Sequence, residues 1–316
     1  MGGAESRTIT PGPPVAAALW GGMYVVSKWG FESIPPVTLA FLRVLLGAVT
    51  LLLVVRVAYP RRSFSRTEWR GFAFLGLWVA ITMATQFVGT DLTTASEGAL
   101  VTVLTPVFTL LLGVAVLDES VNRRTAVGMA LAFAGTLWVV AGQYDLATPG
   151  GGNPATPGGA NASTLGAAGV GGVALLVLAS VGWAAYTVWG KPLVRRYSAL
   201  ETATYSTVAA VPMLAALVPV ELAVRDVPLA GIAVTPALVA AVAYLGVAST
   251  ALAWYCWYRG LETADAGTVA VYFFAQPAVG AALGAVLLDE TLSSGFFLGG
   301  ATMAVGIYLV SVADAG

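Results

Sequence analysis

The chain has 316 residues, of which 58% are hydrophobic and only 10% are charged, and its formal net charge is −1. A soluble domain carries about 25% charged residues, so this composition excludes a soluble two-domain enzyme. The lack of a basic excess argues against a nucleic-acid-binding protein. One cysteine and no histidine leave no pattern for a disulfide, a metal site or a bound cofactor. The composition therefore predicts an all-α polytopic membrane protein.

Apolar stretches of the length that a membrane-spanning helix needs, about 20 residues, follow one another along the chain. The segment 143–168 interrupts them, because it is rich in Gly, Pro, Asn, Ser and Thr and is typical of a loop. We expect ten transmembrane helices, at residues 13–31, 37–57, 72–90, 96–117, 125–142, 169–190, 200–220, 236–258, 266–288 and 294–312.

The basic residues lie mostly on alternate connections between these helices. The connections that carry them hold Arg7, Arg56 to Arg70, Arg123 and Arg124, Lys191 to Arg196, and Arg259. Cytoplasmic loops of membrane proteins are enriched in Lys and Arg. We therefore expect a multi-pass protein of the cell membrane with both termini cytoplasmic and the loop 143–168 outside.

An internal repeat links the two halves of the chain. Residues 99–139 align without a gap with residues 270–310, so that Pro106 falls on Pro277 and Leu117-Asp118-Glu119 falls on Leu288-Asp289-Glu290. Each half has five predicted helices, and an odd number gives the halves opposite orientations. The prediction is two inverted five-helix repeats, 13–142 and 169–312, an arrangement typical of secondary transporters. The alternative is that duplication merely builds a stable bundle.

Several short segments resemble a known family. They are Ala18-Leu-Trp-Gly21, Phe41-Leu-Arg43, Pro106-Val-Phe108 before Asp118-Glu119, and Gln276-Pro277 before Asp289-Glu290. In this order and duplication they are similar to the EamA-type transporters of the drug/metabolite transporter superfamily. The resemblance implies ten helices in two EamA repeats, and export or exchange of small metabolites such as amino acids. The long outer linker and the lack of histidine depart from the family pattern.

Aromatic and amide side chains are the candidates for binding a substrate. Trp20 and Tyr24 lie one helical turn apart, and Trp183 and Tyr186 repeat this arrangement in the second half. The other candidates are Gln86, Thr105, Trp254, Tyr272 and Gln276. Amphipathic rings beside a few polar groups suit a small zwitterionic, apolar or cationic metabolite. The alternative is packing or anchoring at the membrane interface.

Four residues are candidates for gating or coupling. Pro106 and Pro277 are expected near the middle of their helices, where proline bends the helix and frees a carbonyl. Arg43 lies inside an apolar stretch, where a charge costs about 2.5–3.5 kcal/mol on insertion scales, so either a partner such as Glu97 or a cavity is expected. Glu97 is the candidate for proton coupling, and passive exchange is the alternative.

Two further patterns predict structural roles. Asp118-Glu119 and Asp289-Glu290 are expected to cap the following helix or bind neighbouring backbone. The GxxxG pairs Gly280/Gly284 and Gly295/Gly299 indicate close helix packing within the chain or a homodimer.

The overall prediction is a secondary transporter, not an enzyme, whose partners are a small-molecule substrate and membrane lipid and not nucleic acid. A non-transporting membrane protein with a structural or receptor role is the alternative.

Overall fold

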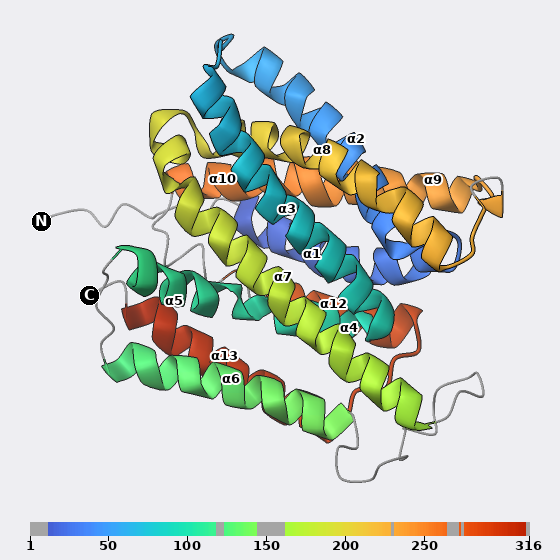
Figure 1. Ribbon diagram of the computed structural model, residues 1–316. Helices are drawn as coiled ribbons and strands as arrows, with labels where there is room; N and C mark the ends of the chain where they lie inside the picture. The colour runs from blue at the N-terminus through green and yellow to red at the C-terminus, as the bar shows by residue number, and fades with distance from the viewer. Residues whose placement is uncertain are drawn as a thin grey trace, which may run out of the picture.

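The computed structural model describes residues 12–117, 123–143, 162–228, 231–263, 272 and 275–313, and every regular element in these ranges is a helix (Figure 1). The elements are α1(Gly12–Phe31), α2(Pro36–Ala58), α3(Arg66–Leu92), α4(Ala95–Val101), η1(Thr102–Leu104), α5(Thr105–Leu117), α6(Arg123–Gln143), α7(Ala162–Arg196), α8(Ala199–Val224), α9(Pro236–Ala243), η3(Tyr244–Leu252), α10(Ala253–Thr263), α12(Ala275–Leu287) and α13(Ser294–Ala313).

Six helical stretches among the described residues are long and apolar enough to cross a membrane. They are Pro36–Ala58, Arg66–Leu92, Ala95–Val116, Ala167–Arg196, Ala199–Val224 and Pro236–Arg259. Three further helices are also apolar but shorter. They are Ala126–Val139, Ala275–Leu287 and Ser294–Leu309. The predicted all-helical, multi-pass membrane protein is confirmed, whereas the ten-span arrangement stays a prediction.

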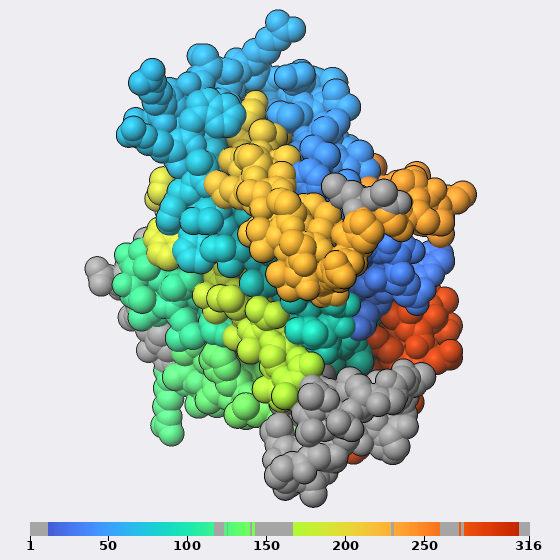
Figure 2. All heavy atoms as spheres, turned by 45° about the vertical axis from the view of Figure 1, so that its right-hand side comes forward, coloured from blue at the N-terminus to red at the C-terminus, as the bar shows by residue number. Residues whose placement is uncertain are grey.

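Ion pairs define the two ends of the bundle. At one end Arg62 binds Glu201 at 3.0 Å and Arg196 binds Glu68 at 2.9 Å, which brings the starts of α3 and α8 together. At the other end Arg225 binds Asp91 at 2.8 Å, which joins the final turns of the same two helices. α3 and α8 therefore run in the same direction. The exposed connection between α2 and α3 projects from the first end (Figure 2).

Two glutamates cap helices that are far away in sequence. Glu221 accepts hydrogen bonds from the backbone N–H groups of Val37 and Thr38 at 2.8 and 2.7 Å, at the start of α2. Glu290 accepts from Ala95 and Ser96 at 2.6 and 3.0 Å, at the start of α4. These N–H groups have no partner within their own helices.

The prediction that the second acidic pair binds backbone is confirmed for Glu290, although the capped helix is α4 and not the following α13. Asp289 has φ of 53°, a left-handed conformation that turns the chain toward α4 after α12 ends. The equivalent pair Asp118-Glu119 lies outside the described residues, as does most of the predicted linker.

The two GxxxG pairs serve packing within the chain. A Cβ atom added to Gly299 on α13 would lie 2.5 Å from the carbonyl oxygen of Gly135 on α6, so the two backbones touch. A Cβ atom added to Gly280 would lie 2.5 Å from the Cβ of Ala99. Figure 1 shows α6 and α13 side by side, apart from α2, α3 and α8. The homodimer stays a prediction.

Several predicted spans differ in regularity from the structure. The expected helix 96–117 is divided into α4, the 3₁₀ turn η1 and α5, and the expected helix 236–258 contains the π-helix η3. α7 begins at Ala162, seven residues earlier than predicted. Helix-forming Ala and Leu continue the helix into a segment whose Gly and Ser content predicts a loop.

The prolines expected at mid-helix lie in the first turns of helices. Pro106 is the second residue of α5 and Pro277 is the third residue of α12. Proline is tolerated in a first turn because the N–H group that it lacks would have no helical partner there. The mid-span bend that the sequence predicts is therefore a break between two helices in the first half.

Candidate functional site

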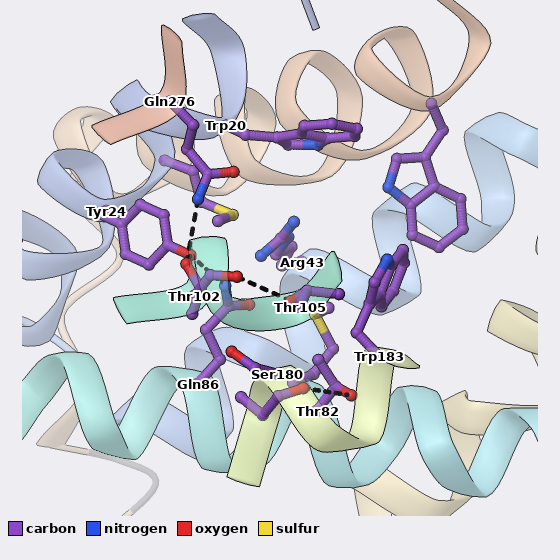
Figure 3. Close-up of a pocket in the computed structure, with 14 residues that line it drawn as sticks. Trp20, Tyr24, Arg43, Thr82, Gln86, Thr102, Thr105, Ser180, Trp183 and Gln276 are labelled. Carbon is purple, nitrogen blue, oxygen red and sulfur yellow. Dashed lines mark hydrogen bonds between the residues drawn. The ribbon is translucent and has the colours of Figure 1, made fainter. Parts of the chain in front are cut away.

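A cavity lies between the helices at the centre of the bundle (Figure 3). Its volume is about 70 Å³. A single water needs about 10–15 Å³ on this measure, so the space suits several waters or a small metabolite. The lining residues come from α1, α2, α3, η1, α5, α7, α10 and α12, and are Trp20, Met23, Tyr24, Arg43, Thr82, Met83, Gln86, Thr102, Thr105, Ala179, Ser180, Trp183, Trp254 and Gln276.

The structure brings seven of the nine predicted binding residues together on this lining. They are Trp20, Tyr24, Gln86, Thr105, Trp183, Trp254 and Gln276. Tyr186 is buried one turn further along α7 and stacks against the ring of Trp183, so it supports the wall from behind. Tyr272 is not a lining residue of this cavity. Whether these residues bind a substrate stays a prediction.

Three tryptophans form the aromatic part of the wall. The ring of Trp183 lies 5.1 Å from that of Tyr186 with an interplanar angle of 28°, and 5.4 Å from that of Trp254 in an edge-on arrangement. Trp20 donates its indole N–H to the carbonyl of Ser249 at 3.0 Å. The two ring contacts of Trp183 and the indole hydrogen bond of Trp20 fix the positions of these rings. The aromatic part of the wall is therefore rigid.

A hydrogen-bond network forms the polar part of the wall. The hydroxyl of Tyr24 lies 2.5 Å from that of Thr102, and Gln86 donates to Tyr24 at 2.6 Å. Gln276 donates to Thr102 at 3.1 Å from α12. The network therefore joins α1, α3, η1 and α12, and Figure 3 shows these side chains converging from different helices.

The donors and acceptors of this network are consistent with one proton arrangement. Thr102 donates its hydroxyl to the carbonyl of Gly98 at 2.8 Å. The amides of Gln86 and Gln276 act as donors, so Tyr24 donates to Thr102 while it accepts from Gln86. The hydroxyls of Tyr24 and Thr102 each donate and accept in this network, and a buried polar network of this kind favours a single arrangement of the core.

Two irregular helical segments, the 3₁₀ turn η1 and the π-helix η3, lie next to the cavity and position Thr102 and Thr250. The carbonyl of Thr102, four residues before Pro106, accepts hydrogen bonds from the backbone N–H of Thr105 in a 3₁₀ turn and from the hydroxyl of Thr105 at 2.8 Å. In the π-helix η3, Thr250 donates to the carbonyl of Leu245, five residues earlier, at 2.8 Å. Single-turn π-helices frequently occur at functional sites. Both breaks lie beside the cavity.

The four predicted gating residues have different surroundings. Arg43 lines the cavity, and its Nε donates to the hydroxyl of Thr250 at 2.9 Å. Glu97 lies in the first turn of α4, where it and Thr94 form a capping box. No salt bridge joins Arg43 to Glu97 among the described residues. Pro106 and Pro277 each follow a lining residue directly, Thr105 and Gln276.

Six of the fourteen lining residues are not predicted from the sequence, and they are Met23, Thr82, Met83, Thr102, Ala179 and Ser180. Arg43, predicted as a gating residue that needs a partner or a cavity, also lies on the lining. One signal in the sequence points to Thr102. It lies four residues before Pro106, and proline has no N–H group to donate to the Thr102 carbonyl. The others look like ordinary apolar or small residues of a packed helix.

Comparisons with known proteins agree with this architecture. The profile of the EamA-like transporter family matches residues 15–141 and again residues 170–312. An uncharacterized transporter of Archaeoglobus fulgidus is 26% identical over 93% of each chain. A probable amino-acid metabolite efflux pump of Salmonella typhimurium is 26% identical over 93% of this chain and 92% of its own.

A solved crystal structure has the same fold, with a TM-score of 0.62 at 18% identity over 98% of each chain. The two family matches together cover most of the chain, including every helix that lines the cavity. The chain belongs to the EamA-like transporter family of membrane proteins.

Proposed function

We propose that this protein is a secondary transporter that exports or exchanges small metabolites across the cell membrane by alternating access. The observation that carries the proposal is the central cavity, which is lined by helices of both family-matched segments and has an aromatic wall opposite a polar network. Ligand sites of this kind combine apolar walls with a few placed polar groups. The efflux pumps among the relatives support an amino-acid-like or drug-like metabolite.

The proposed membrane arrangement has ten spans in two inverted five-helix repeats, with both termini cytoplasmic. Two separate family matches of similar length support the repeat. The exposed arginines at the α2–α3 connection support a cytoplasmic position for that end of the bundle. Two related halves with opposite orientation can exchange inward-open and outward-open shapes around a fixed site.

The proposed moving parts are the helix breaks beside the cavity. The first break is η1 with Pro106, where Thr102 and Thr105 line the cavity. The second is the first turn of α12 with Pro277, where Gln276 lines it. Hinges in transporters are a few element-terminal residues that absorb changes in backbone angles. The network through Thr102 connects both breaks, so rotation of one half changes the hydrogen bonds of the other.

Counterflow in liposomes tests the proposal. Purified protein is reconstituted, loaded with unlabelled metabolite, and offered trace labelled metabolite from a panel of amino acids, amines and organic acids. Trp183→Ala removes part of the aromatic wall, and we expect it to lower the initial rate at least about tenfold, by analogy with buried aromatic anchors. Trp189→Ala is the matched control on the same helix, because Trp189 stacks on Trp78 at 5.4 Å and does not line the cavity.

No counterflow of any panel compound would contradict transport. Binding without flux would favour the alternative of a receptor-like membrane protein. Equal losses in Trp183→Ala and Trp189→Ala would point to general destabilisation, and the cavity would then lose its assigned role.

A further inference from the structure

Arg43 is the feature of the cavity that general packing does not explain. Its side chain is 2% exposed, and its charged end lies on the cavity lining (Figure 3). Thr250 accepts a hydrogen bond from Nε, and the guanidinium carbon lies 5.5 Å from the ring centroid of Phe87. These contacts hold the guanidinium group in one place but do not neutralise its charge.

The remaining donors of Arg43 are incompletely used. Nη1 is buried and has no hydrogen-bond partner. No carboxylate forms a salt bridge with Arg43 in the part of the chain that the structure describes. A buried charge without a partner is strongly unfavourable, and buried arginine usually binds a carboxylate or a phosphate. The guanidinium group of Arg43, on the cavity lining, therefore carries a positive charge that no described carboxylate balances.

The other lining residues select the rest of the ligand. The described lining contains no Asp or Glu, so an ammonium group would find no carboxylate partner. The hydroxyls of Thr105 and Ser180 already donate to backbone carbonyls, at 2.8 and 3.1 Å. The tryptophans and the two methionines offer contact to an apolar body. The single positive charge of Arg43 beside these apolar walls is complementary to an apolar molecule that carries one negative charge.

We propose that the cavity binds a monoanionic organic acid, with its carboxylate on the guanidinium group of Arg43 and its apolar body against Trp20, Trp183 and Trp254. The proposal rests on the proposed transport function and names its substrate class. The carboxylate replaces the counter-ion that the protein does not supply. An amino acid brings the same carboxylate but also an ammonium group without a partner, and an amine brings only the unfavourable charge. The order of affinity is acid, then amino acid, then amine.

Three ligands that share one apolar body, but carry a carboxylate, both a carboxylate and an ammonium group, or an ammonium group alone, test this order. The probes are 3-phenylpropanoate, phenylalanine and 2-phenylethylamine, with 4-methylpentanoate, leucine and 3-methylbutylamine as a second series. Binding to the full chain in lipid nanodiscs at neutral pH is measured by intrinsic tryptophan fluorescence and isothermal titration calorimetry. We expect at least one acid to bind about tenfold more tightly than its amino acid, and the amines to bind more weakly still.

Variants of Arg43 separate charge from shape. Arg43→Gln keeps a hydrogen-bond donor and loses the charge, and we expect it to weaken acid binding at least about tenfold and to abolish the preference for the acid. Arg43→Lys keeps the charge and should keep part of the preference, with weaker binding because a bidentate contact is lost. Arg225→Gln is the surface control and should leave the preference unchanged, since Arg225 is 39% exposed and pairs with Asp91.

Folding of each variant is checked by thermal unfolding without ligand. Arg43→Gln removes an uncompensated buried charge, so its midpoint should not fall below that of the wild type. If Arg43→Gln does not fold, Arg43→Lys alone decides, because loss of the acid preference in that folded variant overturns the proposal.

The outcomes distinguish this proposal from the transport function. Equal or tighter binding of the amino acids or amines, unchanged acid binding in Arg43→Gln, or no binding of either acid at millimolar concentration would overturn the anion site. Counterflow that depends on Trp183 would still uphold transport in each of these cases. Acid binding that depends on Arg43 without any flux would uphold the anion site and overturn transport.

Discussion

The α6–α13 pair and the helices around the cavity fill their interiors in opposite ways. Between α6 and α13 the backbones touch at Gly135 and Gly299, and the hydroxyl of the buried Thr136 donates to Ala132 of its own helix at 3.0 Å and contacts only the sulfur of Met303 across the interface, at 3.7 Å. Around the cavity, buried polar side chains reach other helices, as Tyr24 and Gln276 do at Thr102. The first region is closely packed between regular helices, and the second is polar and lies between interrupted helices.

The difference shows where a membrane protein can place irregular backbone. Inside a bilayer each freed N–H or C=O group needs a partner within the protein. At η1 the backbone N–H and the hydroxyl of Thr105 both bind the carbonyl of Thr102, and at η3 the indole of Trp20 binds the carbonyl of Ser249. The helix breaks therefore occur where cavity side chains can satisfy them, and regular helices pack elsewhere through small residues.

Among the variants that test this difference between the two regions, Gly299→Leu is expected to lower stability most. The added side chain meets the backbone of Gly135 and Val139, which cannot move aside, so the α6–α13 contact opens. Overpacking of this kind costs about 1–3 kcal/mol and occasionally more, and a rigid backbone contact places Gly299→Leu at the upper end. Thermal unfolding in detergent measures it. Gly171→Leu on α7 is the control, because a Cβ atom added at Gly171 would meet nothing within 4 Å, and equal midpoints for the two variants would contradict the tight contact.

Thr102→Val should give the next largest effect and sharpen the cavity side of the comparison. Valine keeps the shape of threonine but removes the acceptor of Tyr24 and Gln276. We expect a loss of about 1–2 kcal/mol in stability, because interhelical hydrogen bonds in membranes have this upper magnitude. Thr302→Val on α13 is the control, since its hydroxyl bonds only to Leu298 of its own helix. A loss in both variants of the same size would contradict the network.

Glu290→Ala should have a smaller effect, at the start of α4. The substitution removes the acceptor for the N–H groups of Ala95 and Ser96, and losing a helix cap costs about 1 kcal/mol. The midpoint of thermal unfolding reports the loss. Glu32→Ala, an exposed glutamate at the same end of the bundle, should leave the midpoint unchanged. A midpoint unchanged in Glu290→Ala would show that α4 does not depend on this cap.

Arg225→Ala should have the smallest effect. Its ion pair with Asp91 is partly exposed, at 39% and 23% for the two side chains. Such pairs contribute about 0–1 kcal/mol, so we expect a change within about 0.5 kcal/mol that vanishes at high salt. A larger loss that persists in high salt would show that this pair holds the ends of α3 and α8 together.

Much of the site could be predicted because its residue types are unusual in a membrane helix. Gln86, Gln276 and the paired tryptophans stand out from Leu, Val and Ala, and a polar side chain in an apolar helix must find a partner or a cavity. Thr82, Ser180 and Ala179 escaped prediction for the opposite reason. Small residues are common at every helix contact, so their type does not distinguish a cavity wall from packing.

The sequence alone determined that the chain is a helical membrane protein, because apolar length and charge placement act through the bilayer and need no knowledge of neighbours. It also marked the duplicated prolines and the isolated Arg43. Only the tertiary structure decided the partners. Arg43 lies beside Thr250 and the cavity and not in a pair with Glu97, and Glu290 caps α4 and not α13. Long-range hydrogen bonds depend on how helices pack, and helical periodicity gives only the face on which a residue lies.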